Sequence, residues 1–459
     1  MKKPTKIIGM NIENFRSLVN QKEEINLHPA RLIPFYKPGD EMSLTSIFLS
    51  ALRLIEEFKD SIFKSINLSK SGNILVFTEV EFLLFDNKRI DGLLLVVRGK
   101  KILEAVILEM KNKTNTIDEG QILSYVEIGK AYGIPKIVTI SNQFVSQPTQ
   151  SPISIKLPKA VQMYHLSWSY ILTLAQILLF KNDNNIADED QVEIMIEVVK
   201  YFENSKSGVI GFTQMRAGWT ELIQKMNTGA LIKLDDECLS DTITSWLEEE
   251  RDMALILSRE LGLLVQSVKT KFKDDLNKRI DYEKRELVKT KSIKSILRVN
   301  GAVSDIEVSP NFERRNIRMA VNLLAPQDKG IRGQISWLKN QINRLEKKNI
   351  EGFTKIKDEI RVEINLKFSN TPIIVGLDEL DDIYYSYKDK QVKNFNVFQI
   401  KYLGKKIEGR KVVIDIIESM LLNYYEMIVQ HLKIWQKPAP KIVKNNNIEE
   451  IEQTPIKAK

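Results

Sequence analysis

An acidic residue in one apolar segment and an acid-x-lysine triplet at the end of the next form the pattern with the clearest chemical meaning in this chain. Asp91 lies near the start of segment 89–98, while Glu109 lies near the end of segment 101–110 and is followed two residues later by Lys111. Two carboxylates beside an ammonium group suit metal-dependent phosphodiester hydrolysis, because Mg²⁺ needs only one or two carboxylates besides water and substrate phosphate. The pattern predicts an active site in which Asp91 and Glu109 hold Mg²⁺ or Mn²⁺.

A hairpin would bring these residues together. Gly99 and Lys100, between the two segments, suit a two-residue antiparallel turn. Since the turn lies at one end of the pair, the two acidic residues meet at the other end. Side chains alternate between strand faces, so the acids share a face with apolar residues, which are Leu93, Leu95 and Val97 on one strand and Leu103, Ala105 and Ile107 on the other. Carboxylates on such a face are expensive to bury unless a cation neutralises them.

The next predicted element is a helix that carries two further candidates. Thr116 and Glu119 have the spacing of a capping box, which predicts a helix from this point to about Gly133. Gln121 and Tyr125 lie four residues apart and therefore share one face of it.

The order of the predicted elements indicates an α/β fold. A helix over 43–64 precedes three strands, the capped helix and a buried strand at 137–140. A strand at 161–166 and a helix at 168–180 would complete the sheet. We therefore expect an α/β/α core with a mixed sheet, followed by a helical connector and a C-terminal α+β domain.

Asp91, Glu109-x-Lys111 and Gln121-x-x-x-Tyr125, in this order, resemble the motifs of the PD-(D/E)xK nuclease superfamily, in the branch with a downstream QxxxY motif. The resemblance covers residues 28–182 and implies a restriction-endonuclease-like core, although Ile90 stands where the family name has Pro. It implies that the Asp and Glu hold Mg²⁺, that the Lys orients and helps to deprotonate a water molecule, and that the Gln and Tyr shape the site. Many members also carry a Glu on the first helix, for which the candidate is Glu57, ahead of Glu56.

The function expected from this resemblance is hydrolysis of DNA, with RNA not excluded, in bacterial phage defence or DNA processing. Two alternatives stay open. A chain with 28% charged residues can carry such a motif by chance, in which case Glu109 and Lys111 would form a surface ion pair worth under about 1 kcal/mol. The chain could also be a catalytically silent protein that keeps the fold and binds nucleic acid or assembles with partners.

Composition limits the class of protein. The single cysteine, Cys238, excludes intramolecular disulfides and thiolate metal clusters and favours a reducing compartment. Three histidines far apart in the sequence, His28, His165 and His431, do not suggest a histidine metal centre, and His165 is expected to be structural. No apolar run approaches the ~20 residues that cross a bilayer, so we expect a cytoplasmic protein without a membrane anchor.

One segment holds most of the net charge of +8. Between Ser267 and Arg298, 11 Lys and Arg residues stand against 5 Asp and Glu residues, an excess of six positive charges. Such an excess suits a nucleic-acid backbone, because neutralised phosphates release counterions, whereas a solvated helix face is the alternative. The candidates for nucleic-acid binding are Lys269, Lys271, Lys273, Lys278 and Arg279.

Five regions are predicted along the chain of 459 residues. They are an N-terminal extension (1–27), the nuclease-like domain (28–182), a helical connector (183–265), an α+β domain (266–436) and a disordered tail (437–459). Asn300 and Gly301 predict a hairpin in the α+β domain, and helices are expected over 331–348 and 410–435. This domain would bind nucleic acid, a partner protein or a second copy of the chain.

Overall fold

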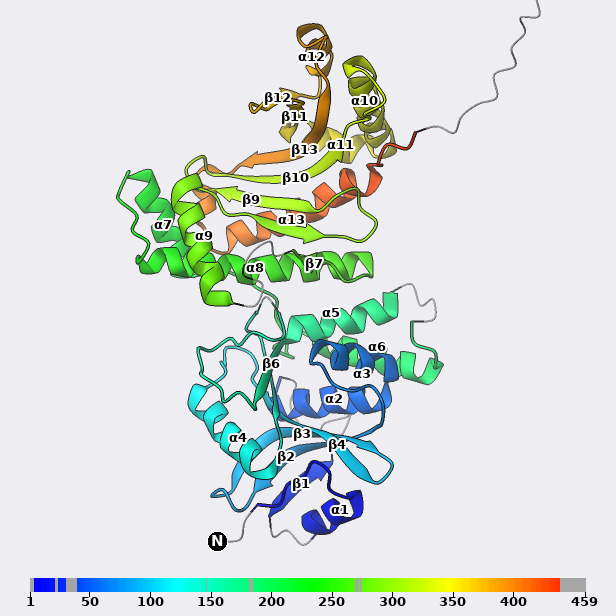
Figure 1. Cartoon of the computed structure of the whole chain (residues 1–459), viewed down its shortest axis with the longest axis vertical. Coiled ribbons are helices and arrows are strands. Elements are labelled where there is room, and N and C mark those ends of the chain that lie inside the picture. The colour runs from blue at the N-terminus through cyan, green and yellow to red at the C-terminus, as the bar shows by residue number, and fades with distance from the viewer. Residues whose placement is uncertain are drawn as a thin grey trace, which may run out of the picture.

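The computed structural model describes residues 4–20, 24–29, 39–145, 147–180, 185–268, 272 and 275–437. Apart from its first residue, the predicted tail lies outside this range. Figure 1 shows two parts, each built on its own sheet, with helix α8 (Glu237–Leu261) at the junction between them. The N-terminal part carries the candidate site.

The first sheet has six strands that follow one another in chain order. The pairs from β1 to β4 are antiparallel, and β4, β5 and β6 are parallel, so the sheet is mixed, as predicted. Arg98 pairs with Lys101, which confirms the two-residue turn between the third and fourth strands. The strands are β1 (Ile25–Pro29), β2 (Asn73–Phe82), β3 (Lys88–Arg98), β4 (Lys101–Met110), β5 (Lys136–Ser141) and β6 (Gln162–Ser167).

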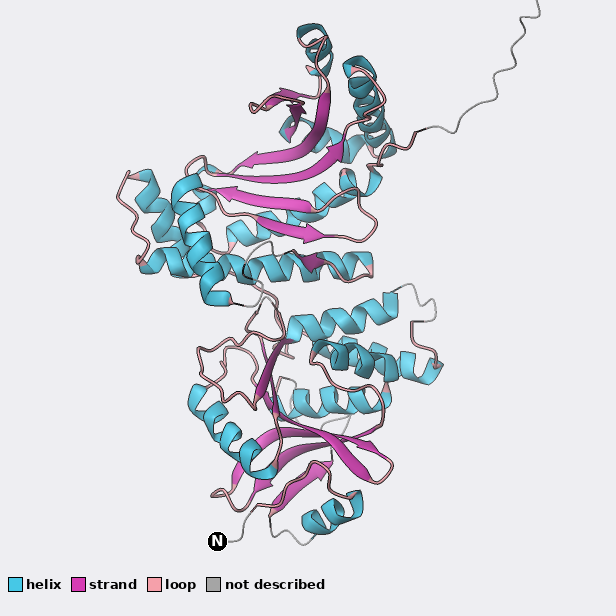
Figure 2. Ribbon diagram, in the orientation of Figure 1, coloured by secondary structure: helices cyan, strands magenta, loops and turns pink. Residues whose placement is uncertain are grey.

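Helices cover both faces of this sheet, which gives three layers (Figure 2). Helix α4 (Glu119–Tyr132) packs on one face, where it meets Leu93 and Leu95 of β3. Leu94 and Val96 point to the other face, which is covered by α2 (Glu41–Leu54), α3 (Glu56–Ser65), α5 (Trp168–Leu179) and α6 (Glu189–Glu203). The central strands are apolar on both sides because both sides are covered.

The structure differs from three of the predictions for this part of the chain. The helix predicted over 43–64 is two helices, because Ile55 between them is extended (φ −120°, ψ 108°). Leu103 is 40% exposed, since it is left unpaired by a bulge, and Ile102 takes its place in the core. The N-terminal region is part of the first sheet, because β1 pairs with β2 and Phe15 of α1 (Ile12–Asn20) lies in the core.

The second sheet is antiparallel throughout and confirms an α+β region. Its order is β12-β11-β13-β10-β9-β8-β7, and helices α8, α10 and α13 pack against one face. The strands are β7 (Gln266–Ser267), β8 (Ser295–Arg298), β9 (Ile306–Asn311), β10 (Asn316–Leu324), β11 (Ile360–Leu366), β12 (Ile373–Gly376) and β13 (Val392–Tyr402). The helices besides α8 are α7 (Ala217–Asn227), α9 (Leu276–Thr290), α10 (Ile331–Lys348), α11 (Ile350–Ile356), α12 (Leu380–Ser386) and α13 (Val412–Met427).

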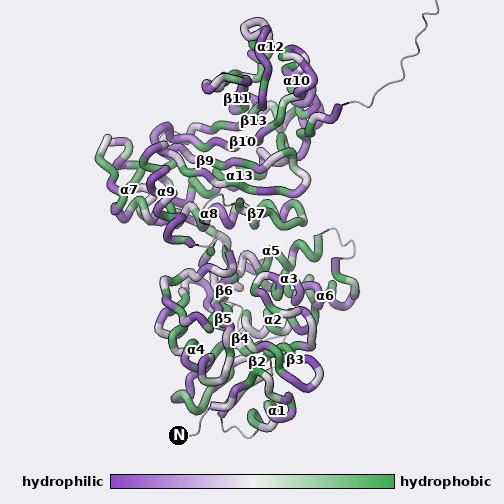
Figure 3. The backbone as a smooth tube through the Cα atoms, viewed as in Figure 1, coloured by the Kyte–Doolittle hydropathy of each residue, from purple (hydrophilic) through white to green (hydrophobic). Residues whose placement is uncertain are grey.

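The predicted connector over 183–265 is not a separate unit. Phe202 of α6 packs in the core of the first sheet, whereas Trp219 of α7 and Trp246 of α8 pack in the core of the second. Figure 3 shows hydrophobic and hydrophilic residues interspersed along these helices. An amphipathic pattern indicates that one face is buried, but not which sheet it packs against.

Helix α8 contacts both parts. Leu255 belongs to the first core, and Met253 and Leu257 belong to the second. Asp252 accepts a hydrogen bond from the hydroxyl of Ser169 on α5 at 3.3 Å, which links the junction to the helix that follows β6. Within the described ranges, no helix is long and apolar enough to span a membrane.

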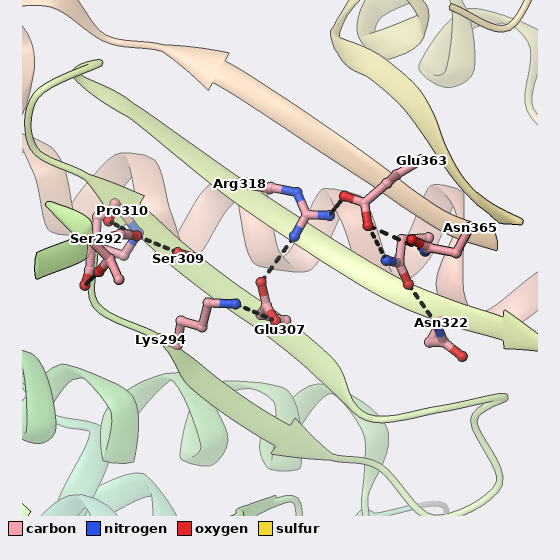
Figure 4. Close-up of polar contacts among 11 residues, drawn as sticks. Ser292, Lys294, Glu307, Ser309, Pro310, Arg318, Asn322, Glu363 and Asn365 are labelled. Atoms are coloured by element: carbon pink, nitrogen blue, oxygen red, sulfur yellow. Dashed lines mark hydrogen bonds and ion pairs between the residues drawn. The ribbon is translucent and has the colours of Figure 1, made fainter. Parts of the chain in front are cut away.

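The second sheet carries a polar network on the face opposite its helices (Figure 4). Arg318 lies between Glu307 and Glu363, at 2.9 and 3.1 Å, and Asn322 donates to Asn396 at 2.6 Å. Arg318 alternates with core residues Ile317 and Met319, which places it on the outer face. Because its charge is balanced by neighbours, the network stabilises strand pairing and adds no excess charge there.

Candidate active site

The two carboxylates lie where β3 and β4 separate. The last β3–β4 pair at this end is Gly92 with Leu108, and β4 continues beside β5 with Glu109 opposite Thr139. Asp91 bridges the gap, because its carboxylate accepts a hydrogen bond from the backbone N–H of Met110 at 2.7 Å. The structure therefore brings Asp91 and Glu109 together at the end of the hairpin opposite to its turn.

Glu109 is fully buried and has two partners. Its Oε1 lies 2.5 Å from Nζ of Lys111, and its Oε2 accepts a hydrogen bond from the hydroxyl of Tyr125 at 2.5 Å. The Lys111 backbone is held on both sides, since its N–H donates to the Ile140 carbonyl at 2.8 Å and its carbonyl accepts from the Trp168 indole at 2.9 Å. The Lys111 side chain is 18% exposed, so its ammonium group is held over Glu109 at the edge of the solvent.

Helix α4 presents Gln121 and Tyr125 to the same site. The N-cap lies two residues later than predicted, because Asp118 rather than Thr116 is the cap and accepts from the backbone N–H of Gln121 at 2.7 Å. The Gln121 amide donates to the Tyr125 hydroxyl at 2.8 Å, and that hydroxyl in turn donates to Glu109. These hydrogen bonds fix the orientation of the buried carboxylate.

The charges at this site perturb one another. Burial and then the charge of Glu109 raise the pKa of Asp91 well above its usual value, against the opposing effects of the Met110 N–H and Lys111. Burial is the largest single influence on Lys111 and lowers its pKa. The hydrogen bond to Glu109 and the negative charges of Glu109, Asp91 and Glu41 together outweigh burial, so the pKa of Lys111 is raised. Lys111 is therefore an ammonium ion at neutral pH, while the Asp91 carboxylate is destabilised until a cation or a proton neutralises it.

We expect Asp91→Asn to raise the melting temperature of the metal-free protein at neutral pH. A folded-state pKa above the unfolded one means that the fold favours protonated Asp91, so the native residue costs stability at every pH above its unfolded pKa, and the full cost applies above the raised pKa. The gain should shrink as the pH falls from the raised pKa towards the unfolded one, below which Asp91 is protonated in both states. Calorimetric melting in EDTA across this pH range measures the difference, and an equal or lower melting temperature for the variant at neutral pH would contradict it.

The prediction of Glu57 as a site residue is wrong. Glu57 lies in α3, where its Oε1 accepts from the backbone N–H of Ala187 at 3.1 Å, because the break at Ile55 separates it from the first helix. Glu41, in the first turn of α2, lies at the site instead, and its carboxylate accepts from the Asn112 N–H at 3.0 Å directly after Lys111. The sequence signal that could have indicated Glu41 is its position as an acidic residue directly before the apolar pattern of the helix.

Glu79 and Arg89 also lie at the site, and sequence reasoning missed both. Glu79 on β2 lies opposite Asp91 on β3, because the residues on either side of it are paired, Thr78 with Gly92 and Val80 with Ile90. Glu79 has a left-handed backbone (φ 52°) inside a strand, a costly conformation that tends to occur at functional sites. Its Oε2 lies 2.9 Å from Nε of Arg89. The period of two along a strand gives no sign of such a residue.

The residues present fit a divalent cation with few protein ligands. Among the residues that the structure describes, no group of three or more His, Cys, Asp or Glu side chains is arranged to hold a metal ion. Mg²⁺ does not need one, because it keeps several waters and is held by one or two carboxylates plus substrate phosphate. Asp91 and Glu109 fit this requirement, since burial and the charge of Glu109, which raise the pKa of Asp91, would both be offset by a bound cation.

His165 is structural. Its ring nitrogens lie 2.8 Å from the Thr139 hydroxyl and 2.9 Å from the Gln143 carbonyl oxygen, behind the strand that carries Glu109. Burial lowers its pKa to about 4, so the ring is neutral at physiological pH.

The predicted nucleic-acid-binding set is only partly described. Lys269, Lys271 and Lys273 lie outside the described residues. Lys278 on α9 is exposed and pairs with Asp275 at 3.0 Å, so it stays available at the surface. The prediction that Arg279 binds nucleic acid is wrong. The residue is 5% exposed, and its guanidinium donates hydrogen bonds to both oxygens of the Glu250 carboxylate, at 3.0 and 2.8 Å.

Arg279→Ala is expected to destabilise the protein by roughly 3–5 kcal/mol, because it leaves the buried carboxylate of Glu250 without its cation. Lys278→Ala removes an adjacent surface charge and is expected to change stability by less than about 0.5 kcal/mol. Urea or thermal unfolding of the two variants measures the difference. Equal stabilities would mean that Arg279 is a surface charge after all.

Comparison of the chain with protein-family models, with curated proteins and with solved structures gave no match. Its function must therefore be inferred from the geometry of this site.

Proposed function

We propose that the protein is a Mg²⁺-dependent nuclease that hydrolyses phosphodiester bonds of DNA. The observation that carries the proposal is the convergence of Asp91, Glu109 and Lys111 where β3 and β4 separate, with Tyr125 and Gln121 holding Glu109. These side chains come from two strands and one helix, so their meeting depends on the fold. A chance motif on a charged surface would not bury one carboxylate completely and raise the pKa of the other.

The topology supports membership of the PD-(D/E)xK superfamily with a restriction-endonuclease-like core. The order α2, α3, β2, β3, β4, α4, β5 is two consecutive helices, three antiparallel strands, a helix and a parallel strand. This is the order that the motif positions require, with the acid on the second of these strands, the acid-x-lysine triplet at the end of the third, and Gln121 and Tyr125 on the following helix.

Each side chain has a role in the proposed hydrolysis. Asp91 and Glu109 would hold Mg²⁺, which when bound supplies positive charge and Lewis acidity for attack of water on phosphorus. Lys111 contributes a permanent positive charge beside the scissile phosphate, where negative charge grows in the transition state. Tyr125, whose pKa is raised by burial and by the nearby carboxylates, stays a neutral donor and keeps Glu109 in place.

The biological setting is part of the same proposal. A buried, unpaired Cys238 is compatible with the reducing cytoplasm of a bacterium, and phage defence or DNA processing is the expected setting. The second sheet would contact DNA, a partner protein or a second copy of the chain.

The direct test is incubation of the purified protein with linear duplex, circular duplex and single-stranded DNA, and with RNA, in Mg²⁺, in Mn²⁺ and in EDTA. We expect cleavage of DNA in either metal and none in EDTA. Binding without cleavage under all conditions would favour the catalytically silent alternative, and cleavage of RNA alone would change the substrate.

A further inference from the structure

We propose that Arg89 is a substrate-binding residue that contacts a phosphate group next to the scissile one, and that Glu79 positions it. This inference rests on the proposed function, because it assigns a further role at the same site. It adds a residue that none of the sequence motifs includes.

Arg89 lies at the solvent-exposed edge of the site. It lies two residues before Asp91 on β3, a distance of about 7 Å along a strand. Its backbone carbonyl lies 3.2 Å from the Tyr125 hydroxyl that holds Glu109, so its main chain is fixed by the site itself. Its side chain is 63% exposed, unlike that of Lys111 at 18%. The guanidinium therefore faces solvent from a rigid base.

Glu79 holds one edge of this guanidinium. Its side chain is 10% exposed and its Oε2 lies 2.9 Å from Nε of Arg89. A guanidinium carries five donors in a fixed fork, so pairing through Nε leaves the two terminal nitrogens for a second group. The left-handed backbone conformation of Glu79, which costs free energy, directs its carboxylate towards Arg89.

The described side chains of the site carry a net negative charge, so an exposed cation is needed to meet a phosphate group of the substrate. Asp91, Glu109, Glu79 and Glu41 bring four carboxylates to the site, against Lys111 and Arg89 as cations, which leaves a net charge of −2. Mg²⁺ would offset the two carboxylates that hold it, but a nucleic acid brings further phosphates beside the scissile one. Lys111 is largely buried over Glu109, whereas Arg89 is the more exposed of these two cations and can meet a neighbouring phosphate by a charge-assisted, bidentate hydrogen bond.

The test measures binding of the full-length protein to fluorescently labelled 20-nucleotide duplex and single-stranded DNA in EDTA, where no strand is cut. We expect Arg89→Gln to weaken binding roughly tenfold, as for loss of one charge-assisted hydrogen bond. The slope of log affinity against log salt should flatten by about 0.7–0.9, as for loss of one phosphate contact. Arg89→Lys should keep the slope but lose several-fold in affinity, because it keeps the charge and loses the fork.

Arg98→Gln is the matched control, since Arg98 is an exposed arginine at the far end of the same strand, beside the hairpin turn. We expect it to bind within about twofold of the native protein. In Mg²⁺, Arg89→Gln should raise KM about tenfold and change kcat less than about threefold, as for loss of binding shared by ground and transition states. Glu79→Gln should weaken binding less than Arg89→Gln, since it frees the guanidinium without removing it.

The outcomes separate this inference from the proposed function. Equal binding by Arg89→Gln and Arg98→Gln, with normal cleavage by the native protein, would overturn the role of Arg89 and leave the nuclease standing. Weaker binding by Arg89→Gln alone, with no cleavage by the native protein in any metal, would support the phosphate contact and overturn the nuclease. A native protein that neither binds DNA in EDTA nor cleaves it in Mg²⁺ or Mn²⁺ would overturn both.

Discussion

Asp91→Asn and Glu109→Gln are each expected to abolish DNA cleavage while preserving the fold. Both variants remove a negative charge that would hold Mg²⁺, and both keep the size of the side chain and an acceptor for its hydrogen bond. The conservative Glu109→Gln matters because Ala at a fully buried position would leave Lys111 and Tyr125 without their partner. Single-turnover cleavage assays and calorimetric titration with Mg²⁺ should show loss of activity together with loss of metal affinity.

Glu57→Gln is the matched control for these variants. Glu57 is an acidic residue of the same region that the structure places away from the site, where it accepts from the Ala187 N–H. It should keep native cleavage and native Mg²⁺ affinity, whereas Glu41→Gln should reduce cleavage because Glu41 lies beside the segment after Lys111. If Asp91→Asn and Glu109→Gln both kept native Mg²⁺ affinity, the assignment of the metal ligands would be lost.

The central hairpin could be predicted because each step depends on local sequence. The turn at Gly99 and Lys100 fixes which ends of the two strands meet, so the convergence of Asp91 and Glu109 at the opposite end follows from the chain alone. The bulge at Leu103, which shifts the register by one residue between the turn and the site, does not follow from the period of two. Gln121 and Tyr125 could be placed for the same reason, because a helix has a known period and their helix starts a few residues after the strand.

Glu41 and Glu79 could not be found in this way, because their positions depend on longer-range structure. Glu79 reaches Arg89 through a left-handed residue inside β2, which no pattern of residue types indicates. Glu41 is brought to Asn112 by the packing of α2 against the sheet, across 71 positions in the sequence. The pattern over 43–64 predicts one continuous helix that carries Glu57, and it gives no sign of the break in the backbone at Ile55.

In the second part of the chain, local charge was likewise not enough to predict which basic residues lie at the surface. Arg279 lies in the most basic segment of the sequence, yet it is buried against Glu250, 29 positions earlier on α8. A local excess of charge gives no information about which of its members find a buried partner. Helix α8 contributes side chains to the cores of both parts, and an amphipathic pattern does not indicate this either.

Lys111→Ala is expected to keep Mg²⁺ binding and lose cleavage by roughly 10²–10⁴-fold, the usual range for a positioned catalytic group. Removal of the ammonium leaves the Glu109 carboxylate with the Tyr125 hydroxyl alone, so its attraction for a cation should persist or increase. The raised pKa of Lys111 means that it acts as a fixed positive charge below that pKa, and the loss should therefore be similar at every pH from 6 to 9.

Lys111→Arg tests whether charge alone is sufficient. The lysine side chain is 18% exposed and 2.5 Å from a buried carboxylate, so the larger, planar guanidinium would have to displace its neighbours to keep that contact. We expect it to restore less than about a tenth of native cleavage, because a charged group displaced by 1 Å can cost about 10²-fold. Native turnover in Lys111→Ala, measured under single-turnover conditions, would show that Lys111 is only the partner that makes burial of Glu109 tolerable. The positive charge for the transition state would then have to come from Arg89 or from the metal alone.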